Sequence, residues 1–204
     1  MNFEKPLPAS ESEQFDALLA EMERNPGGYI EYRSGSPKHK FLEYLLERGY
    51  LLHGSFVEED VDTLEPRQAN DRSKKSGNQK AVYAVSDPIL PLFYAIKDRS
   101  RLRGLVQSGC STDDQGVRTY RFQIDGTRSE KDPWKDGVVH VLSKDGFVQT
   151  IDDAGKLTNE WVSHVPVQSV ARLRVAPDDF PFLEDVRVEM TGKAVQANIP
   201  GENI

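Results

Sequence analysis

Tyr50-Leu51-Leu52-His53-Gly54-Ser55 is a short apolar stretch that ends in a histidine, a glycine and a serine. Its length and its flanks are typical of a buried β-strand. A histidine buried at the end of such a strand needs a hydrogen-bond partner, and the glycine after it lets a ligand approach the backbone closely. The prediction of both fold and site therefore starts from this strand.

A second strand and a helix are predicted after this stretch. Residues 57–80 are mostly polar and predict a long surface loop. Ala81-Val82-Tyr83-Ala84-Val85 predicts the second strand, and Ser86-Asp87-Pro88 opens a helix that reaches about Asp98. The chain thus follows the order strand, loop, strand, helix.

Helices are predicted before the first strand, and hairpins after it. One amphipathic helix covers residues 10–24; a second has Ser36 as its cap, Pro37 in its first turn and Gly49 just after its end. Residues 28–33 predict one short strand. Further strands are predicted at residues 117–124, 137–142, 147–150, 160–166, 169–175 and 186–190. This order predicts an α+β fold with a largely antiparallel sheet.

Composition excludes several classes of protein. The chain has 204 residues, a net charge of −7 and a pI near 5.2, which argues against a dedicated nucleic-acid binder. No apolar run approaches the roughly 18 residues of a membrane helix, and the N-terminal residues contain no apolar signal-peptide core. A single cysteine, Cys110, excludes an internal disulfide. We expect a cytoplasmic protein of one domain with no membrane partner.

The negative charge is unevenly distributed. Residues 66–103 hold nine basic and three acidic side chains, a net charge of +6, whereas residues 1–65 carry −8 and residues 104–204 carry −5. A basic segment in an acidic chain can attract phosphates locally. The alternative interpretation is a solvated surface loop.

Common catalytic and metal-binding motifs are absent from the sequence. It contains no Cys-x-x-Cys, His-Glu-x-x-His, P-loop, Gly-x-Gly-x-x-Gly or Gly-x-Ser-x-Gly pattern, so no metal site is expected. Cys110 lies in Gln107-Ser108-Gly109-Cys110-Ser111, whose composition is typical of a flexible segment. As a nucleophile, this cysteine needs a neighbouring histidine.

The His-Gly-Ser strand and the later Ala81-Val82-Tyr83-Ala84-Val85-Ser86-Asp87 together resemble the NAD-binding core of ADP-ribosyltransferases of the His-Tyr-Glu type. This group includes diphtheria-toxin-like enzymes, poly(ADP-ribose) polymerases and small rifampin-modifying transferases. The resemblance covers roughly residues 49–175 and implies split antiparallel β-sheets. It places such a domain at residues 49–190, after a helical segment at 1–48 that packs on it and before a flexible tail at 191–204.

The resemblance implies a role for each matching residue. In the family, the histidine binds an NAD ribose hydroxyl, the next glycine holds the nicotinamide amide through its backbone, and the tyrosine stacks on the nicotinamide ring. These roles fall on His53, Gly54 and Tyr83. Ser55 completes the His-Gly-Ser element, and Tyr94 is a candidate second stacking ring. The ordinary interpretations are a structural histidine and packed aromatic side chains.

The family's third catalytic residue is an acid near the start of a late strand. Asn159-Glu160-Trp161 resembles the Asn-Glu-Tyr of the polymerases, which makes Glu160 the best candidate; Asp152 and Asp153 are rivals, and a solvent-facing Glu160 is the ordinary alternative. Arg67, in the basic loop between the two strands, is a candidate for contact with the NAD pyrophosphate.

The expected function is transfer of ADP-ribose from NAD, the substrate, to an unknown acceptor: a protein, a small molecule or a nucleic acid. His53, Tyr83 and Glu160 are the predicted catalytic residues. Three alternatives remain open, namely an NAD glycohydrolase, a tRNA 2′-phosphotransferase-like enzyme, and a non-catalytic binding module with the same fold.

Overall fold

A computed structural model describes residues 10–56, 61–69, 78–102, 106–113, 118–125 and 133–189. The chain divides into two compact units: Met1–Lys97 with Lys135–Pro181, and Asp98–Trp134 with Phe182–Ile204. His53, Tyr83 and Glu160 all belong to the first unit. The domain boundaries at residues 49 and 190 stay predictions, and the predicted tail at 191–204 lies outside the described residues.

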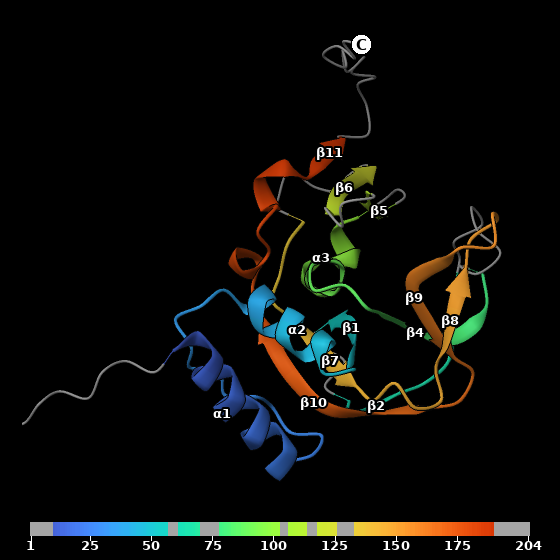
Figure 1. Cartoon of the computed structure of the whole chain (residues 1–204). Coiled ribbons are helices and arrows are strands. Elements are labelled where there is room, and N and C mark those ends of the chain that lie inside the picture. Colours follow the sequence, from blue (N-terminus) through green and yellow to red (C-terminus); the bar gives the residue numbers. More distant parts are fainter. Residues whose placement is uncertain are drawn as a thin grey trace, which may run out of the picture. The chain divides into compact units, whose positions relative to one another are not determined.

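The first unit is built on one antiparallel sheet (Figure 1), whose strands follow the order β2-β10-β7-β1-β4-β9-β8, with β3 also paired to β4. Every one of these pairings is antiparallel, which confirms the predicted α+β class. The strands are β1 (Leu51–Phe56), β2 (Thr63–Leu64), β3 (Arg67–Gln68), β4 (Lys80–Val85), β7 (Gly137–Leu142), β8 (Val148–Ile151), β9 (Leu157–Ser163) and β10 (Val167–Val175).

Helix α3 (Leu90–Ile96) packs directly on the backbones of β1 and β7. A Cβ atom at Gly54 would lie 2.1 Å from the Pro91 carbonyl oxygen, and one at Gly137 would lie 2.2 Å from that of Ala95. Both glycines are therefore required by the close approach of this helix. The opposite face of the sheet has its own core, which includes Leu51, Leu64, Val82, Ala84, Leu142 and Phe147, with Trp161 and Val167 packed against it.

Helices α1 (Glu11–Arg24) and α2 (Lys38–Glu47) pack against each other through aromatic rings. The ring centre of Phe15 lies 5.4 Å from that of Phe41 and 5.5 Å from that of Tyr44. The predicted stop of α2 is confirmed, since Gly49 follows its C-cap with a φ of 87°.

Two predictions in the N-terminal segment are wrong in detail. Pro37 itself is the N-cap of α2, and the Ser36 hydroxyl instead donates to the Glu11 carboxylate at 2.6 Å. Residues 28–33 form no regular strand: Tyr29 makes an isolated parallel bridge to Arg172 of β10. Gly28 and Ile30 bond the Arg172 backbone, so the segment lies along the sheet without extended pairing.

The second unit holds a three-stranded sheet of order β11-β6-β5, in which β11 runs parallel to β6. Tyr120, Phe122 and Phe182 stack together within it. The strands are β5 (Val106–Thr112), β6 (Arg118–Asp125) and β11 (Arg187–Glu189). Strand β5 corrects the expectation of a flexible segment around Cys110. Its seven residues pair one-for-one with β6, which compensates for their weak hydrophobic pattern.

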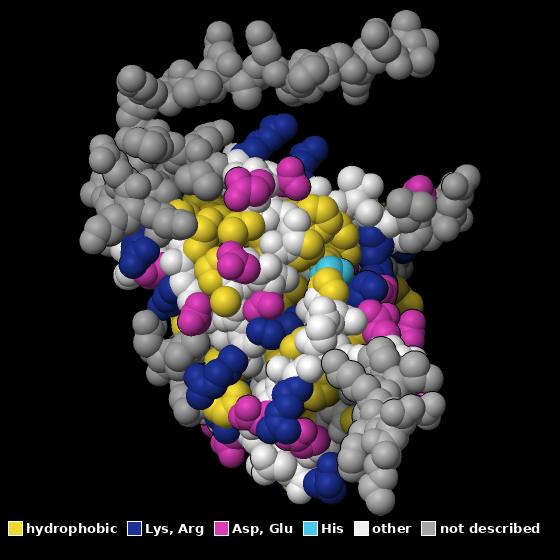
Figure 2. Space-filling model, turned by 90° about the vertical axis from the view of Figure 1, so that its left-hand side faces the viewer, with side chains coloured by type: hydrophobic (Ala, Val, Ile, Leu, Met, Phe, Trp, Pro, Cys, Tyr) yellow, Lys and Arg dark blue, Asp and Glu magenta, His cyan; other side chains and the backbone are white. Residues whose placement is uncertain are grey.

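The described residues also include three short 3₁₀ helices, η1 (Arg99–Arg101), η2 (Pro177–Asp179) and η3 (Leu183–Asp185). No helix in the described residues is long and apolar enough to cross a bilayer. On the face seen in Figure 2, basic and acidic side chains are interspersed around hydrophobic ones over the described part of the surface.

Candidate functional site

Three of the predicted site residues, His53, Tyr83 and Glu160, lie in or close to one row of paired residues that crosses three strands. Val85 of β4 is the Cα partner of Leu52 on β1 and of Glu160 on β9. His53 follows Leu52 directly, and Tyr83 precedes Val85 by two positions. Side chains of paired and alternate strand residues share a sheet face, so Tyr83 and Glu160 project from one face, and His53, one position after Leu52, projects from the other. The fold thus brings together the backbones of three segments that are far apart in sequence.

His53 bridges the point at which β1 and β4 separate. Leu52–Val85 is the registered Cα pair between these strands, and one residue further the His53 Nδ1 donates to the Tyr83 carbonyl oxygen at 2.6 Å. A carbonyl oxygen can only accept, so Nδ1 carries the proton. A neutral ring in this tautomer has Nε2 as a hydrogen-bond acceptor, which suits a ligand hydroxyl.

Gly54 and Tyr83 lie at this point. Gly54 follows His53 and contacts the α3 backbone closely, while Tyr83 is half-buried and its hydroxyl accepts from the Gln79 amide at 3.0 Å. Tyr94 lies on α3, with the Lys97 Nζ 4.0 Å from its ring centre. Ser55 lies on the same face of β1 as His53, where its hydroxyl is buried and bonded to the His140 Nε2 at 2.7 Å.

The three candidate acids occupy different environments. Glu160 is half-buried within β9 and belongs to the row. Asp152 and Asp153 are exposed in the turn between β8 and β9. The Asp152 carboxylate accepts from the amides of Ala154 at 2.9 Å and Lys156 at 2.8 Å, so it holds the turn. Of the three, Glu160 is the acid on the Tyr83 face of the sheet, in the row of paired residues that passes next to His53.

The basic segment is only partly described. Arg67 is exposed on β3 and pairs with Ala81, two residues before Tyr83, so it emerges from the same sheet face as Tyr83. Arg101 forms an ion pair with Asp98 at 3.0 Å. The loop positions Arg72, Lys74 and Lys75 lie outside the described residues.

His140 is a site neighbour that the sequence analysis did not single out. It is the Cα partner of His53 on β7, and the two rings meet edge-on with their centres 5.9 Å apart. His140 is fully buried, and its Nδ1 is bonded to the Ser169 hydroxyl at 2.8 Å. Its sequence signal is a polar residue inside the apolar run 137–142, because a histidine buried in such a strand needs hydrogen-bond partners.

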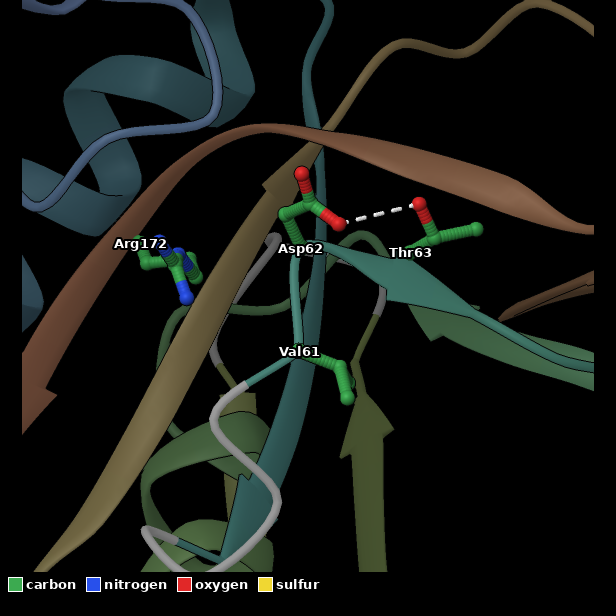
Figure 3. A pocket seen from close by; sticks show the side chains of 4 residues that line it. All are labelled: Val61, Asp62, Thr63 and Arg172. Atoms are coloured by element: carbon green, nitrogen blue, oxygen red, sulfur yellow. Dashed lines mark hydrogen bonds between the residues drawn. The ribbon is translucent and has the colours of Figure 1, made fainter.

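A separate hollow of about 460 Å³ lies at Val61, Asp62, Thr63 and Arg172 (Figure 3). Arg172 is paired with His140, which places this hollow two strands, or about 10 Å, from His53. The Arg172 Nε donates to the Gly27 carbonyl oxygen at 2.9 Å, and its guanidinium stacks on Tyr29. The hollow therefore does not coincide with the row of predicted site residues.

Other reactive groups do not assemble into a second centre. Within the described ranges, no group of three or more His, Cys, Asp or Glu side chains could hold a metal ion. Cys110 is half-buried on β5, opposite Tyr120.

Comparisons with protein-family models, with curated proteins and with solved structures each gave no match.

Proposed function

We propose that this protein uses NAD as a substrate and transfers its ADP-ribosyl group to a nucleophilic acceptor. The observation that carries the proposal is the row Leu52–Val85–Glu160, because it gathers the His-Gly-Ser, Tyr and Glu elements of the sequence resemblance. These elements are separated by up to about a hundred residues in the chain. Their backbones meet across adjacent strands at the point where β1 and β4 separate and His53 bonds the Tyr83 carbonyl, which supports one shared site.

In this proposal each residue has a chemical task. The His53 Nε2 accepts from a ribose hydroxyl, because Nδ1 is committed to the Tyr83 carbonyl. The Gly54 backbone holds the nicotinamide amide, and the Tyr83 ring stacks on the nicotinamide. Glu160 hydrogen-bonds the 2′-hydroxyl of the nicotinamide ribose and stabilises the positive charge that develops on the sugar.

The reaction breaks the bond between the ribose C1′ and the nicotinamide nitrogen. The bonding electron pair leaves with the nitrogen and gives neutral nicotinamide. The acceptor's lone pair forms the new bond to C1′, and the acceptor loses one proton to solvent. When water is the acceptor, the products are free ADP-ribose and nicotinamide, so the same site accounts for glycohydrolase activity.

The test is calorimetry with NAD together with mass spectrometry of released nicotinamide. We expect binding and release by the wild-type protein, and a loss of release of at least about a hundredfold in Glu160→Gln, which keeps the size of the side chain and removes its charge. Asp153→Asn is the matched control, since this neighbouring acid is exposed and outside the row; it should retain full activity. Absence of both NAD binding and nicotinamide release would contradict the proposal.

Product analysis separates the alternatives. Free ADP-ribose as sole product indicates the glycohydrolase, whereas loss of phosphate from a 2′-phosphorylated RNA in the presence of NAD indicates the phosphotransferase. NAD binding without nicotinamide release indicates the non-catalytic module.

A further inference from the structure

We propose that His140 is a positioning residue, which holds the His53 ring in the orientation that the reaction needs; this inference rests on the proposed function. The geometry behind it is a buried chain of side chains across three strands. The His140 Nε2 is bonded to Ser55 of β1 at 2.7 Å, and its Nδ1 to Ser169 of β10 at 2.8 Å. With a partner at each nitrogen, the imidazole is fixed in both position and tilt.

This fixed ring lies against His53. Ser55 follows His53 by two positions, so both side chains lie on the face of β1 from which His140 emerges on β7. The edge-on contact between the two rings, with centres 5.9 Å apart, supports His53 on the side of β7. The Tyr83 carbonyl holds it on the side of β4. The His53 ring is therefore held from both neighbouring strands.

The polar character of position 140 is not required by packing. His140 is 0% exposed and sits in a strand whose other residues are glycine, valine or leucine, all buried. An aliphatic side chain fills such a position without desolvating two ring nitrogens and two hydroxyls. A fully bonded polar group in the interior does, however, fix a single geometry. Here that geometry is imposed beside the residue that contacts the ribose.

The test compares Ser169→Ala with Ser163→Ala. Ser169→Ala removes the partner of the His140 Nδ1 from a strand that does not contact His53 in the sheet order. Ser163→Ala is the matched control: Ser163 is equally buried in the same sheet, and its hydroxyl donates to the Val165 carbonyl oxygen at 3.1 Å. His140→Phe keeps a ring and removes both hydrogen bonds. Circular dichroism establishes that each variant is folded.

Two readouts are measured, nicotinamide release and imidazole ¹⁵N NMR, which distinguishes Nδ1–H from Nε2–H in each of the four histidines. In Ser169→Ala and His140→Phe we expect the Nδ1–H signature of His53 to give way to a tautomer mixture. We also expect kcat to fall about tenfold with little change in KM. Ser163→Ala should leave both readouts unchanged.

An unaltered His53 tautomer in both Ser169→Ala and His140→Phe overturns the positioning role, as does an equal fall of kcat in Ser163→Ala. The NMR result does not depend on turnover. A wild-type protein that releases no nicotinamide contradicts the proposed function alone, and the imidazole spectra still decide whether His140 orients His53.

Discussion

Gly54 is the residue at which the packing of the sheet and the candidate site coincide. Its missing side chain lets the Pro91 carbonyl of α3 approach to 2.1 Å from where a Cβ would stand. We expect Gly54→Ala to lower the free energy of unfolding by about 3 kcal/mol, because the clash is with backbone that cannot move aside locally. Gly109→Ala is the control, since nothing lies within 4 Å of a Cβ at that strand position. Urea unfolding measures the loss of stability in both variants. Equal losses would show that the close approach of α3 to Gly54 is not the cause.

Tyr44 is the residue that links stability to alkaline pH. Burial, together with the hydrogen bond to the Asp16 carboxylate, raises the pKa of Tyr44 to about 12. The unfolded chain releases this proton near pH 10, so the folded state is favoured below pH 10 and loses this contribution as the pH rises toward 12. In Tyr44→Phe the free energy of unfolding should therefore decline less steeply over this window. Urea unfolding at pH 9, 10 and 11 tests this, and parallel curves for the two proteins contradict it.

Among the elements, helix α3 depends on one buried carboxylate just before its N-terminus. The Asp87 Oδ1 accepts from the amides of Ile89 and Leu90, both at 2.9 Å, and the residue is 1% exposed. Asp87→Ala leaves both buried donors without this acceptor, and we expect it to cost about 2 kcal/mol of unfolding free energy. Asp87→Asn keeps the Oδ1 acceptor and should cost less than half as much. Equal losses of Asp87→Ala and Asp87→Asn in thermal or urea unfolding would show that the missing Oδ1 acceptor is not the cause.

The elements also show which parts of the fold a local sequence pattern can predict. β1, β4 and β7 were predicted from apolar runs, and the stop of α2 from Gly49, because each signal lies within a few residues. Strand β5 was missed because its serines, glycine and cysteine carry little hydrophobic alternation; pairing with β6 determines it.

In the candidate site, too, local sequence patterns predict one part and strand pairing determines the rest. The motif residues could be named from the chain, but the row Leu52–Val85–Glu160 depends on strand register, which no single segment encodes. The choice of Glu160 over Asp152 likewise came from the turn that Asp152 holds. His140 was hidden because its role arises from Ser55 and Ser169, which lie 85 and 29 residues away from it in sequence.

At the scale of the whole molecule, the two compact units should differ in local stability. In the first unit, β7 has all six residues buried and is paired on both sides, to β1 and β10. In the second unit, β5 is an edge strand of a three-stranded sheet and no residue along it is fully buried. Amide protons open to exchange where few buried apolar contacts resist local unfolding. Native-state hydrogen exchange on the full chain should therefore show β5 and β6 exchanging well before β7.

Low concentrations of urea sharpen this prediction. Exchange in β5 and β6 should accelerate first, while β1 and β7 keep the protection that corresponds to global unfolding. Nicotinamide release, which the proposed function assigns to residues of the first unit, should persist under these conditions. Uniform protection across both units, with exchange and activity lost together at one urea concentration, would mean that the chain unfolds as one cooperative body. In that case the division at Lys97 and Lys135 describes contacts and not stability.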